Sequence, residues 1–388
     1  MKKGCTRRDC TLFLLIMPVK VREIQKWMEA RFPVSWAEDW DRIGLQLGDP
    51  EQQVKRIGIS LEATPHSVAW AVQNDLHLMI CHHPLFFQPV DSLKSNQEPG
   101  RTALQMAKAE IALLAAHTNL DAAPDGVSTA LALRLGLGSL VPLEKRTHDL
   151  VKLVVFVPSG YEEKMTRALD DAEAGQIGSY RLCTFKARGE GTFIPQAGSH
   201  PFVGEIGRIE RVSEWRLEVL TRRVYVDDLV EKIRQAHPYE EMAYDVYPVE
   251  NPSDDVGLGR LGYFDPAISW ETLIHRLKQE VEAPSVRVSG PIPETIQKAA
   301  VCGGSGSKMI SEAIAAGAQV FICGEIGYHP TVSHQGQALT LVEIGHYPSE
   351  KWVIPVLAHA LREANQAEDW GIEVLEDRQP GDPCVYYF

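Results

Sequence analysis

Three short apolar runs in this chain are each followed at once by side chains that commonly bind metal ions. The runs are Leu76–Cys81, Ile111–Ala116 and Leu339–Ile344. The polar side chains after them are His82 and His83, then His117 and Asp121, and then His346 and Glu350. Apolar runs of this length predict buried strands, and open α/β sheets collect ligands at the carboxyl ends of such strands. We therefore expect these side chains to meet at one site.

Each pair has a simpler explanation when it is taken alone. Neighbouring side chains in a strand point to opposite faces, so His82 and His83 are also typical of a solvated surface pair. Asp121 suits a polar turn before a helix, and Glu350 suits the first turn of a helix that begins near Pro348, where a carboxylate opposes the macrodipole. Three such pairs after three strands favour a shared site over coincidence.

The donor set indicates which ions would bind. Three histidines and two carboxylates form a nitrogen and oxygen site suited to Zn²⁺, Fe²⁺ or Mn²⁺. Five ligands exceed what one structural zinc ion needs, and no cysteine completes such a site. Two cations about 3.5–4 Å apart, bridged by Glu350, would use all five ligands and leave positions for water.

Two further residues are candidates for proton transfer. Glu325 and His329 follow another apolar run, Gln319–Cys323, so they could face the same cleft. Either residue could act as a general base or could orient a ligand. The alternative for His329 is that it caps a turn before Pro330.

A glycine-rich segment, Gly303–Ser307, precedes a predicted helix at Lys308–Ala316. The backbone N–H groups of Gly304, Ser305 and Gly306 could therefore bind a phosphate. The segment matches neither the Walker pattern nor a full dinucleotide fingerprint, and glycine-rich turns are common without any ligand.

Composition and charge exclude several classes of protein. The chain has 388 residues, of which 44% are hydrophobic and 23% are charged, as in ordinary globular domains. Its 39 basic and 52 acidic residues give a net charge of −13, which disfavours nucleic acids and membrane surfaces as partners. Seven separated cysteines without a C-x-x-C motif indicate reduced thiols. We therefore expect a cytoplasmic protein.

The N-terminus resembles a short signal peptide. Basic residues precede the apolar run Thr11–Met17, which is too short to span a bilayer and lacks a small-residue cleavage site. We interpret residues 1–16 as an N-terminal extension before a natural start at Met17.

The order of predicted elements indicates an α/β protein with an insert. Residues 17–147 and 251–388 alternate strands and helices, which favours a largely parallel sheet covered by helices. Residues 148–250 instead follow the order β-α-β-β-α-β with an extra hairpin, which is the ferredoxin-like plan. The glycine-rich segment Val256–Gly262 is typical of the boundary after such an insert. We predict one discontinuous α/β domain carrying an inserted α+β domain.

The separate motifs together resemble a known family. His82-His83-Pro84, His117-Thr-Asn-Leu-Asp121 and Gly345-His346-Tyr347-Pro-Ser349-Glu350 resemble motifs of the Nif-three-like dinuclear-metal-centre family. Trp40-Asp41-x-x-Gly44-Leu45-Gln46 and Gly257–Gly262 match further signatures of that family. Many of its members are called GTP cyclohydrolase 1 type 2 homolog. The motifs occur in the family's order from about Val19 to the C-terminus.

The resemblance implies a discontinuous α/β domain that binds two divalent cations, a PII/CutA-like insert in the longer members, and a toroidal homohexamer. The family's metal ligands fall on His82, His83, Asp121, His346 and Glu350, and Glu350 is the one that touches both ions. His117 and His329 match other polar positions around the cleft, and we expect His117 to support the ligands.

The chain departs from the family pattern at four places. Arg42 stands where the family usually has Asn, and Glu62 stands where Asp is common. Glu325 and Gly327 stand where an Asp and a Lys are frequent. These changes leave the ligands intact but alter the charge that would meet a phosphate.

Two functions remain open from the sequence. The first is a metal-dependent hydrolase of the GTP cyclohydrolase 1 type 2 kind, in which activated water attacks a purine nucleotide or a similar small molecule. The second is a non-catalytic hexameric metal-binding scaffold or sensor with a regulatory insert.

Overall fold

The computed structural model describes residues 18–147, 149–172, 174–377 and 381–387. The predicted N-terminal extension, residues 1–16, lies outside the described residues. Within the described ranges, no helix combines the length and the apolar character needed to cross a membrane. The chain divides into two compact units, one holding the chain up to Arg31, residues 40–117 and the chain from Lys351 onward, the other holding residues 32–39 and 118–350.

The first unit is built on a five-stranded sheet. The strand order is β1-β4-β3-β2-β15, and every neighbouring pair is parallel except β1 with β4. The strands are β1 (Gly44–Leu47), β2 (Arg56–Ser60), β3 (Leu78–Cys81), β4 (Ala112–Ala115) and β15 (Glu373–Glu376). The predicted largely parallel sheet is present. Its central strands β3 and β4 are buried along their whole length, as their apolar sequences require.

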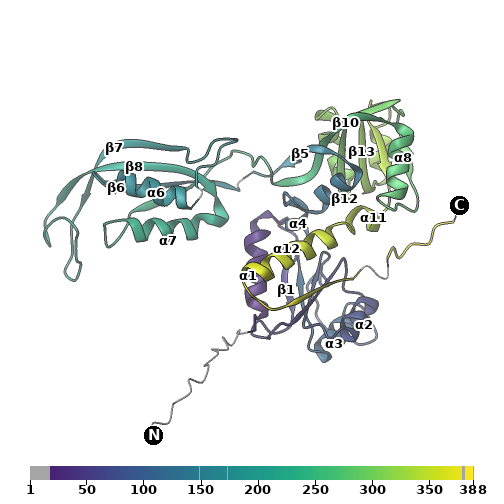
Figure 1. Ribbon diagram of the computed structural model, residues 1–388, viewed down its shortest axis with the longest axis horizontal. Helices are drawn as coiled ribbons and strands as arrows, with labels where there is room; N and C mark the ends of the chain where they lie inside the picture. Colours follow the sequence, from purple (N-terminus) through teal and green to yellow (C-terminus); the bar gives the residue numbers. More distant parts are fainter. Residues whose placement is uncertain (1–17, 148, 173, 378–380, 388) are drawn as a thin grey trace, which may run out of the picture. The chain divides into compact units, whose positions relative to one another are not determined.

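Four helices cover this sheet (Figure 1). They are α1 (Val21–Arg31), α2 (Pro65–Gln73), α3 (Gly100–Lys108) and α12 (Val353–Ala367). Helix α2 begins at the predicted place, because the Thr64 hydroxyl accepts the Ser67 amide and Pro65 occupies the first helical position. Apolar side chains of α2 and α3 pack with Met79, Cys81 and Leu113 on one face of the sheet.

The second unit contains a six-stranded mixed sheet. The strand order is β11-β14-β13-β12-β10-β5, in which β12, β13 and β14 are parallel and the remaining pairs are antiparallel. The strands are β5 (Gly138–Lys145), β10 (Gly257–Ser269), β11 (Arg287–Ser289), β12 (Thr295–Ser305), β13 (Val320–Glu325) and β14 (Thr340–Glu343).

Short helices accompany this sheet. The α-helices are α4 (Thr118–Ala122), α5 (Val127–Leu135), α8 (Trp270–Gln279), α9 (Ile310–Ala315), α10 (Tyr328–Ser333) and α11 (His346–Glu350). Two 3₁₀ turns are η1 (Val34–Trp36) and η3 (Ser307–Met309). The helix predicted over Lys308–Ala316 is therefore a 3₁₀ turn followed by α9.

Two features of this unit differ from the sequence prediction. The segment Val256–Gly262, predicted as a boundary, lies mostly in strand β10 and pairs with both β5 and β12. Its glycines have a packing role, since a Cβ on Gly262 would overlap Leu140 and the carbonyl of Gly138. The sequence predicted a largely parallel sheet, yet the strands that lead into His82 and His117 are β3 and β4 of the first sheet, and the strand that leads into His346 is β14 of the second.

Residues 149–250 form a third, four-stranded antiparallel sheet with two helices (Figure 1). The elements follow the order β6 (Leu150–Pro158), α6 (Glu162–Asp171), β7 (Thr184–Phe193), β8 (Glu210–Arg222), η2 (Arg223–Tyr225), α7 (Val226–Ala236) and β9 (Tyr244–Pro248). The strand order is β7-β8-β6-β9. In the described residues the expected extra hairpin is absent, because Trp215–Leu220, predicted as a separate strand, is part of the long strand β8.

One residue of this region corrects an interpretation made from charge. The segment His237-Pro-Tyr-Glu-Glu241 reads as an exposed face, yet the His237 side chain is buried. Its Nε2 atom donates to the carbonyl of Phe156, and its Nδ1 atom accepts the amide of Tyr239. His237 therefore links strand β6 to the loop after α7 through two hydrogen bonds.

Candidate metal centre

Three imidazole rings meet at the carboxyl ends of β3 and β4 in the first unit. His82 and His83 follow β3, and their amides donate to the carbonyls of Ser60 and Leu61 at the end of β2. His117 follows β4 in the same way. The ring centroids lie 4.8 to 5.4 Å apart, and one ring nitrogen from each histidine lies within 4.8 Å of the others. These three nitrogens could together hold a metal ion.

Each of these rings is oriented by an oxygen atom at Nδ1. The Nδ1 atom of His82 lies 3.0 Å from the carbonyl oxygen of Ala116. The Nδ1 atoms of His83 and His117 lie 3.3 Å from Glu62 Oε1 and 2.8 Å from Asp41 Oδ1. A carbonyl or carboxylate oxygen only accepts, so Nδ1 carries a proton and Nε2 is the ring nitrogen that can offer a lone pair to a cation. Metal-binding histidines are commonly held in this way.

The segment Trp40–Gln46 holds this site together. The side chain of Asp41 is completely buried beneath His117. The Gln46 side-chain oxygen accepts the amides of Leu85 and Phe86, which fixes the loop that follows His83. Sequence reasoning quoted this segment as a family signature but assigned no role to Asp41, Gln46 or Glu62. The pattern Trp40-Asp41-x-x-Gly44-Leu45-Gln46 was the available signal for Asp41 and Gln46.

The place of His117 bears on the supporting role predicted for it. The sequence assigned it a supporting role, whereas the structure brings its ring into the group with His82 and His83. Asp121 is the fourth residue of α4, in the second unit. The carboxylate paired with His117 is Asp41.

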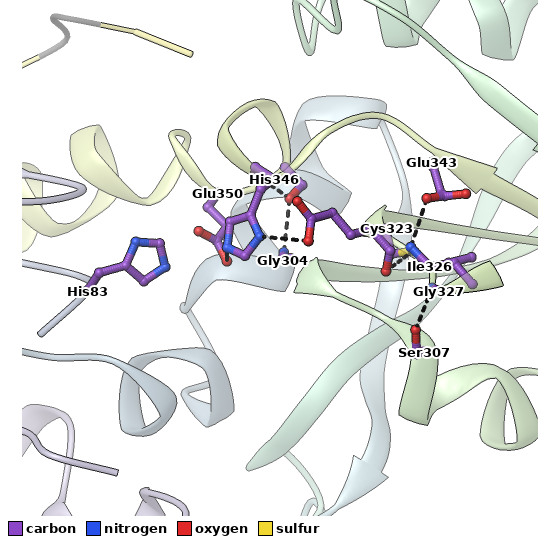
Figure 2. Close-up of polar contacts among 12 residues, drawn as sticks. His83, Gly304, Ser307, Cys323, Ile326, Gly327, Glu343, His346 and Glu350 are labelled. Carbon is purple, nitrogen blue, oxygen red and sulfur yellow. Dashed lines mark hydrogen bonds and ion pairs between the residues drawn. The ribbon is translucent and has the colours of Figure 1, made fainter. Parts of the chain in front are cut away.

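A second cluster lies in the second unit, at the carboxyl ends of β13 and β14. His346 and Glu350 are the first and last residues of α11, so a spacing of four places their side chains on one face of the helix. His346 Nε2 lies 3.2 Å from Glu350 Oε1, and its Nδ1 atom lies 3.6 Å from Glu325 Oε2 (Figure 2). Glu350 is buried, whereas the Glu325 side chain is 61% exposed.

Backbone of the neighbouring strands packs tightly around this helix. A Cβ on Gly304 would overlap Glu350 Oε1, and a Cβ on Gly324 would overlap the Ser349 hydroxyl. The Ser349 hydroxyl donates to the carbonyl of His346 and accepts the amide of Gly304, at 2.7 and 2.9 Å. Gly304 also has a φ of +61°, which glycine adopts without strain. Both strand positions need glycine so that α11 can approach.

The same contacts bear on the predicted phosphate site at Gly304, Ser305 and Gly306. The Gly304 amide is taken by Ser349, and the Gly306 amide donates to the carbonyl of Glu325. Neither N–H group is therefore open to a phosphate. Gly304 and Ser305 are the end of strand β12, and Gly306 precedes the 3₁₀ turn η3.

Asp121 and Glu350 both lie close to Cys302, at the end of β12. Burial, together with the charges of Asp121 and Glu350, raises the pKa of the Cys302 thiol to about 12. Arg260 counters these charges from strand β10 and is itself buried. The structure thus places the two predicted carboxylate ligands near one buried thiol.

His329 stands apart from these contacts. It lies on α10, is exposed, and packs edge-on against the ring of Tyr328 at 5.5 Å. Glu325 is better placed to act on His346, because its carboxylate faces the His346 ring.

Comparison with known proteins identifies the family of this chain. The model of the family Duf34/NIF3 (NGG1p interacting factor 3) matches residues 19–382. The chain belongs to the Duf34/NIF3 family. A relative from Halalkalibacterium halodurans named GTP cyclohydrolase 1 type 2 homolog is 35% identical over 91% of this chain and 95% of its own length. A Bacillus subtilis protein with the same name is 33% identical over 95% of this chain and 99% of its own.

Two solved structures agree with this fold. A Bacillus cereus protein related to NIF3 superposes with a TM-score of 0.85 at 34% identity, covering 96% of this chain and 100% of its own. A Staphylococcus aureus protein gives a TM-score of 0.74 at 27% identity, covering 95% and 99%. The predicted resemblance is confirmed along nearly the whole chain.

Proposed function

We propose that this Duf34/NIF3 protein is a metal-dependent hydrolase that holds two divalent cations. The observation that carries the proposal is the group of His82, His83 and His117. Each ring is oriented by an oxygen atom near its Nδ1, and one ring nitrogen of each histidine lies within 4.8 Å of those of the other two. Neutral imidazoles with an oxygen acceptor behind them suit Zn²⁺, Fe²⁺ or Mn²⁺.

We propose that His82, His83, Asp121, His346 and Glu350 are the ligands of this centre, with His117 as a further nitrogen donor. The family resemblance supports this set, and the pairing of His346 with buried Glu350 fits it, because a protein carboxylate beside an imidazole favours cation binding. Divalent cations held here would lower the pKa of bound water and polarise an electrophilic carbon.

The chain's own groups then have separate tasks. Asp41 and Glu62 keep the proton of His117 and His83 on Nδ1. Glu325 orients His346 and, being exposed, can exchange protons with solvent. His329 is proposed as a second proton carrier on grounds of resemblance alone. The names of the relatives support a purine nucleotide as substrate, with opening of its imidazole ring as the reaction.

The test joins metal content to turnover. Purified protein loaded with Zn²⁺ or Mn²⁺ should contain two ions per chain by elemental analysis, and should release formate from GTP. His346→Ala should lose metal and turnover together. His359→Ala is the matched control, since His359 is an exposed histidine on α12 that pairs only with Glu363. Equal metal content in His346→Ala and His359→Ala would contradict the ligand assignment.

We also propose that residues 148–250 form an inserted ferredoxin-like domain of the PII/CutA kind. The element order β-α-β-β-α-β and the strand order β7-β8-β6-β9 support this assignment. A cytoplasmic homohexamer is proposed from the family resemblance, and light scattering on the purified full chain would measure the assembly.

A further inference from the structure

Two exposed aromatic rings flank His117 in the first unit. The Trp40 ring lies 6.0 Å from the His117 ring at an angle of 74°, and the Phe87 ring lies 5.7 Å away at 89°. Both therefore contact His117 in edge-to-face fashion. Yet Trp40 remains 55% exposed and Phe87 47% exposed. Large aromatic residues with this much exposed surface beside a polar cluster are typical of a ligand-binding surface.

The backbone that carries both rings is fixed by the side chains that build the histidine site. Trp40 precedes Asp41, whose buried carboxylate is bonded to His117. Phe87 follows Leu85 and Phe86, whose amides are both bonded to Gln46. The Gln46 amide group in turn donates to the carbonyl of Arg42, which links the two segments. The rings are thus held at the histidine site and do not sit on an unconstrained surface loop.

The exposed surface of these rings suits one chemical class of ligand. An aromatic side chain stacks on any flat ring, and each such stack contributes about 1–3 kcal/mol to nucleobase binding. A charged phosphate group gains little from the same surface. The neighbouring histidines would place a cation beside whatever ring is held there.

We propose that Trp40 and Phe87 bind a planar heteroaromatic ring beside His117 and so select the substrate by its ring. This inference rests on the proposed function and deepens it, because it assigns the substrate class to two residues that are not metal ligands. It predicts that the ring is recognised separately from any attached sugar or phosphate.

The experiment measures binding by calorimetry on the full chain, both loaded with Zn²⁺ and stripped of metal, using guanosine and ribose 5-phosphate as probes. Guanosine should bind the wild-type protein in both states, and ribose 5-phosphate should not compete with it. Trp40→Leu should weaken guanosine binding about 5- to 150-fold, which corresponds to the loss of one stack. Trp40→Phe should restore part of the affinity, and Phe87→Leu should resemble Trp40→Leu.

Phe185→Leu is the matched control, since Phe185 is 64% exposed and lies on strand β7. This variant should bind guanosine as the wild type does. Metal content measured on the same samples should be unchanged in Trp40→Leu. Failure of the wild type to take up metal while it still binds guanosine would contradict the proposed function and leave this inference standing.

Other outcomes would overturn the inference itself. These are unchanged guanosine affinity in Trp40→Leu, no guanosine binding by the wild type, or equal competition by ribose 5-phosphate. A change of oligomeric state in Trp40→Leu without a change in guanosine affinity would show that these rings instead form a contact between copies.

Discussion

His117 Nδ1 lies 2.8 Å from Oδ1 of Asp41, and the Asp41 side chain has no exposed surface. A buried carboxylate behind an imidazole holds the ring in one orientation and makes its other nitrogen a better donor. The pairing links the segment before β1 to the end of β4, two places that are 76 residues apart.

Replacement of Asp41 by Asn should therefore weaken metal binding by about 10- to 100-fold, since the amide keeps the shape but loses the charge that favours the donor nitrogen. Competition with a coloured chelator would measure the affinity for Zn²⁺. Asp39→Asn is the control, because Asp39 is an exposed acid two residues away. The same affinity in both variants would argue against a role for the buried pair.

Gly304→Ala should disrupt the second cluster. The added methyl group would overlap the Glu350 carboxylate, and the φ of +61° would cost about 1–2 kcal/mol for any residue with a Cβ. We expect a lower melting temperature and the loss of bound metal. Gly317→Ala separates the two effects, since Gly317 has a φ of +69° with no atom near its Cβ position. Equal metal content in the two variants would show that Glu350 tolerates the overlap.

Arg260→Met should destabilise the second unit by about 3 kcal/mol. The Arg260 guanidinium is 2% exposed and donates to the carbonyls of Ala123, Gly257 and Gly259, and burial lowers its pKa to about 10. Methionine fills the space but leaves those buried carbonyls without a donor. Urea unfolding would measure the loss. Arg208→Met, at a side chain that is 73% exposed, should change the free energy of unfolding by less than about 0.5 kcal/mol.

The insert should lose stability as the pH falls below 6.5. Burial lowers the pKa of His237 from its ordinary value of 6.5, so the unfolded chain takes up a proton that the folded imidazole resists. The contribution of His237 to the free energy of unfolding is therefore complete above pH 6.5. It decreases as the pH falls toward the lower pKa of His237 in the folded protein. Thermal unfolding followed between pH 5.5 and 8 would show the change.

His237→Asn should be less stable at pH 8 but should respond less to pH. His200→Asn removes an exposed histidine of the same region, whose side chain is 89% exposed, and should keep the wild-type response. If His237→Asn responded to pH as strongly as the wild type, another group would be responsible.

Local elements were largely predictable from the sequence. Thr64 and Pro65 begin α2 where capping chemistry places it, and the apolar runs before His82 and His117 are the buried strands β3 and β4. These features depend on a few neighbouring residues. The family resemblance, carried by motifs in fixed order, was likewise readable and is confirmed.

Long-range pairing was not predictable in the same way. Nothing near His346 in the sequence indicates that β14 joins a different sheet from β3 and β4, because an apolar strand looks the same in either. The glycines of β10 resemble a linker until their strand neighbours are known. Asp41 is inconspicuous in a chain with 52 acidic residues, and only its burial against His117 shows its role.

The packing of Ser349 against Gly304 and Gly324 limits how this chain can evolve. The hydroxyl serves two partners while two neighbouring backbones leave no room for a Cβ. Ser349→Ala would leave the Gly304 amide without its acceptor. A larger residue at position 349 would force helix α11 away from strands β12 and β13. A change at any one of the three positions therefore disturbs the contacts made by the other two, so an accepted substitution at one position needs compensation at its neighbours.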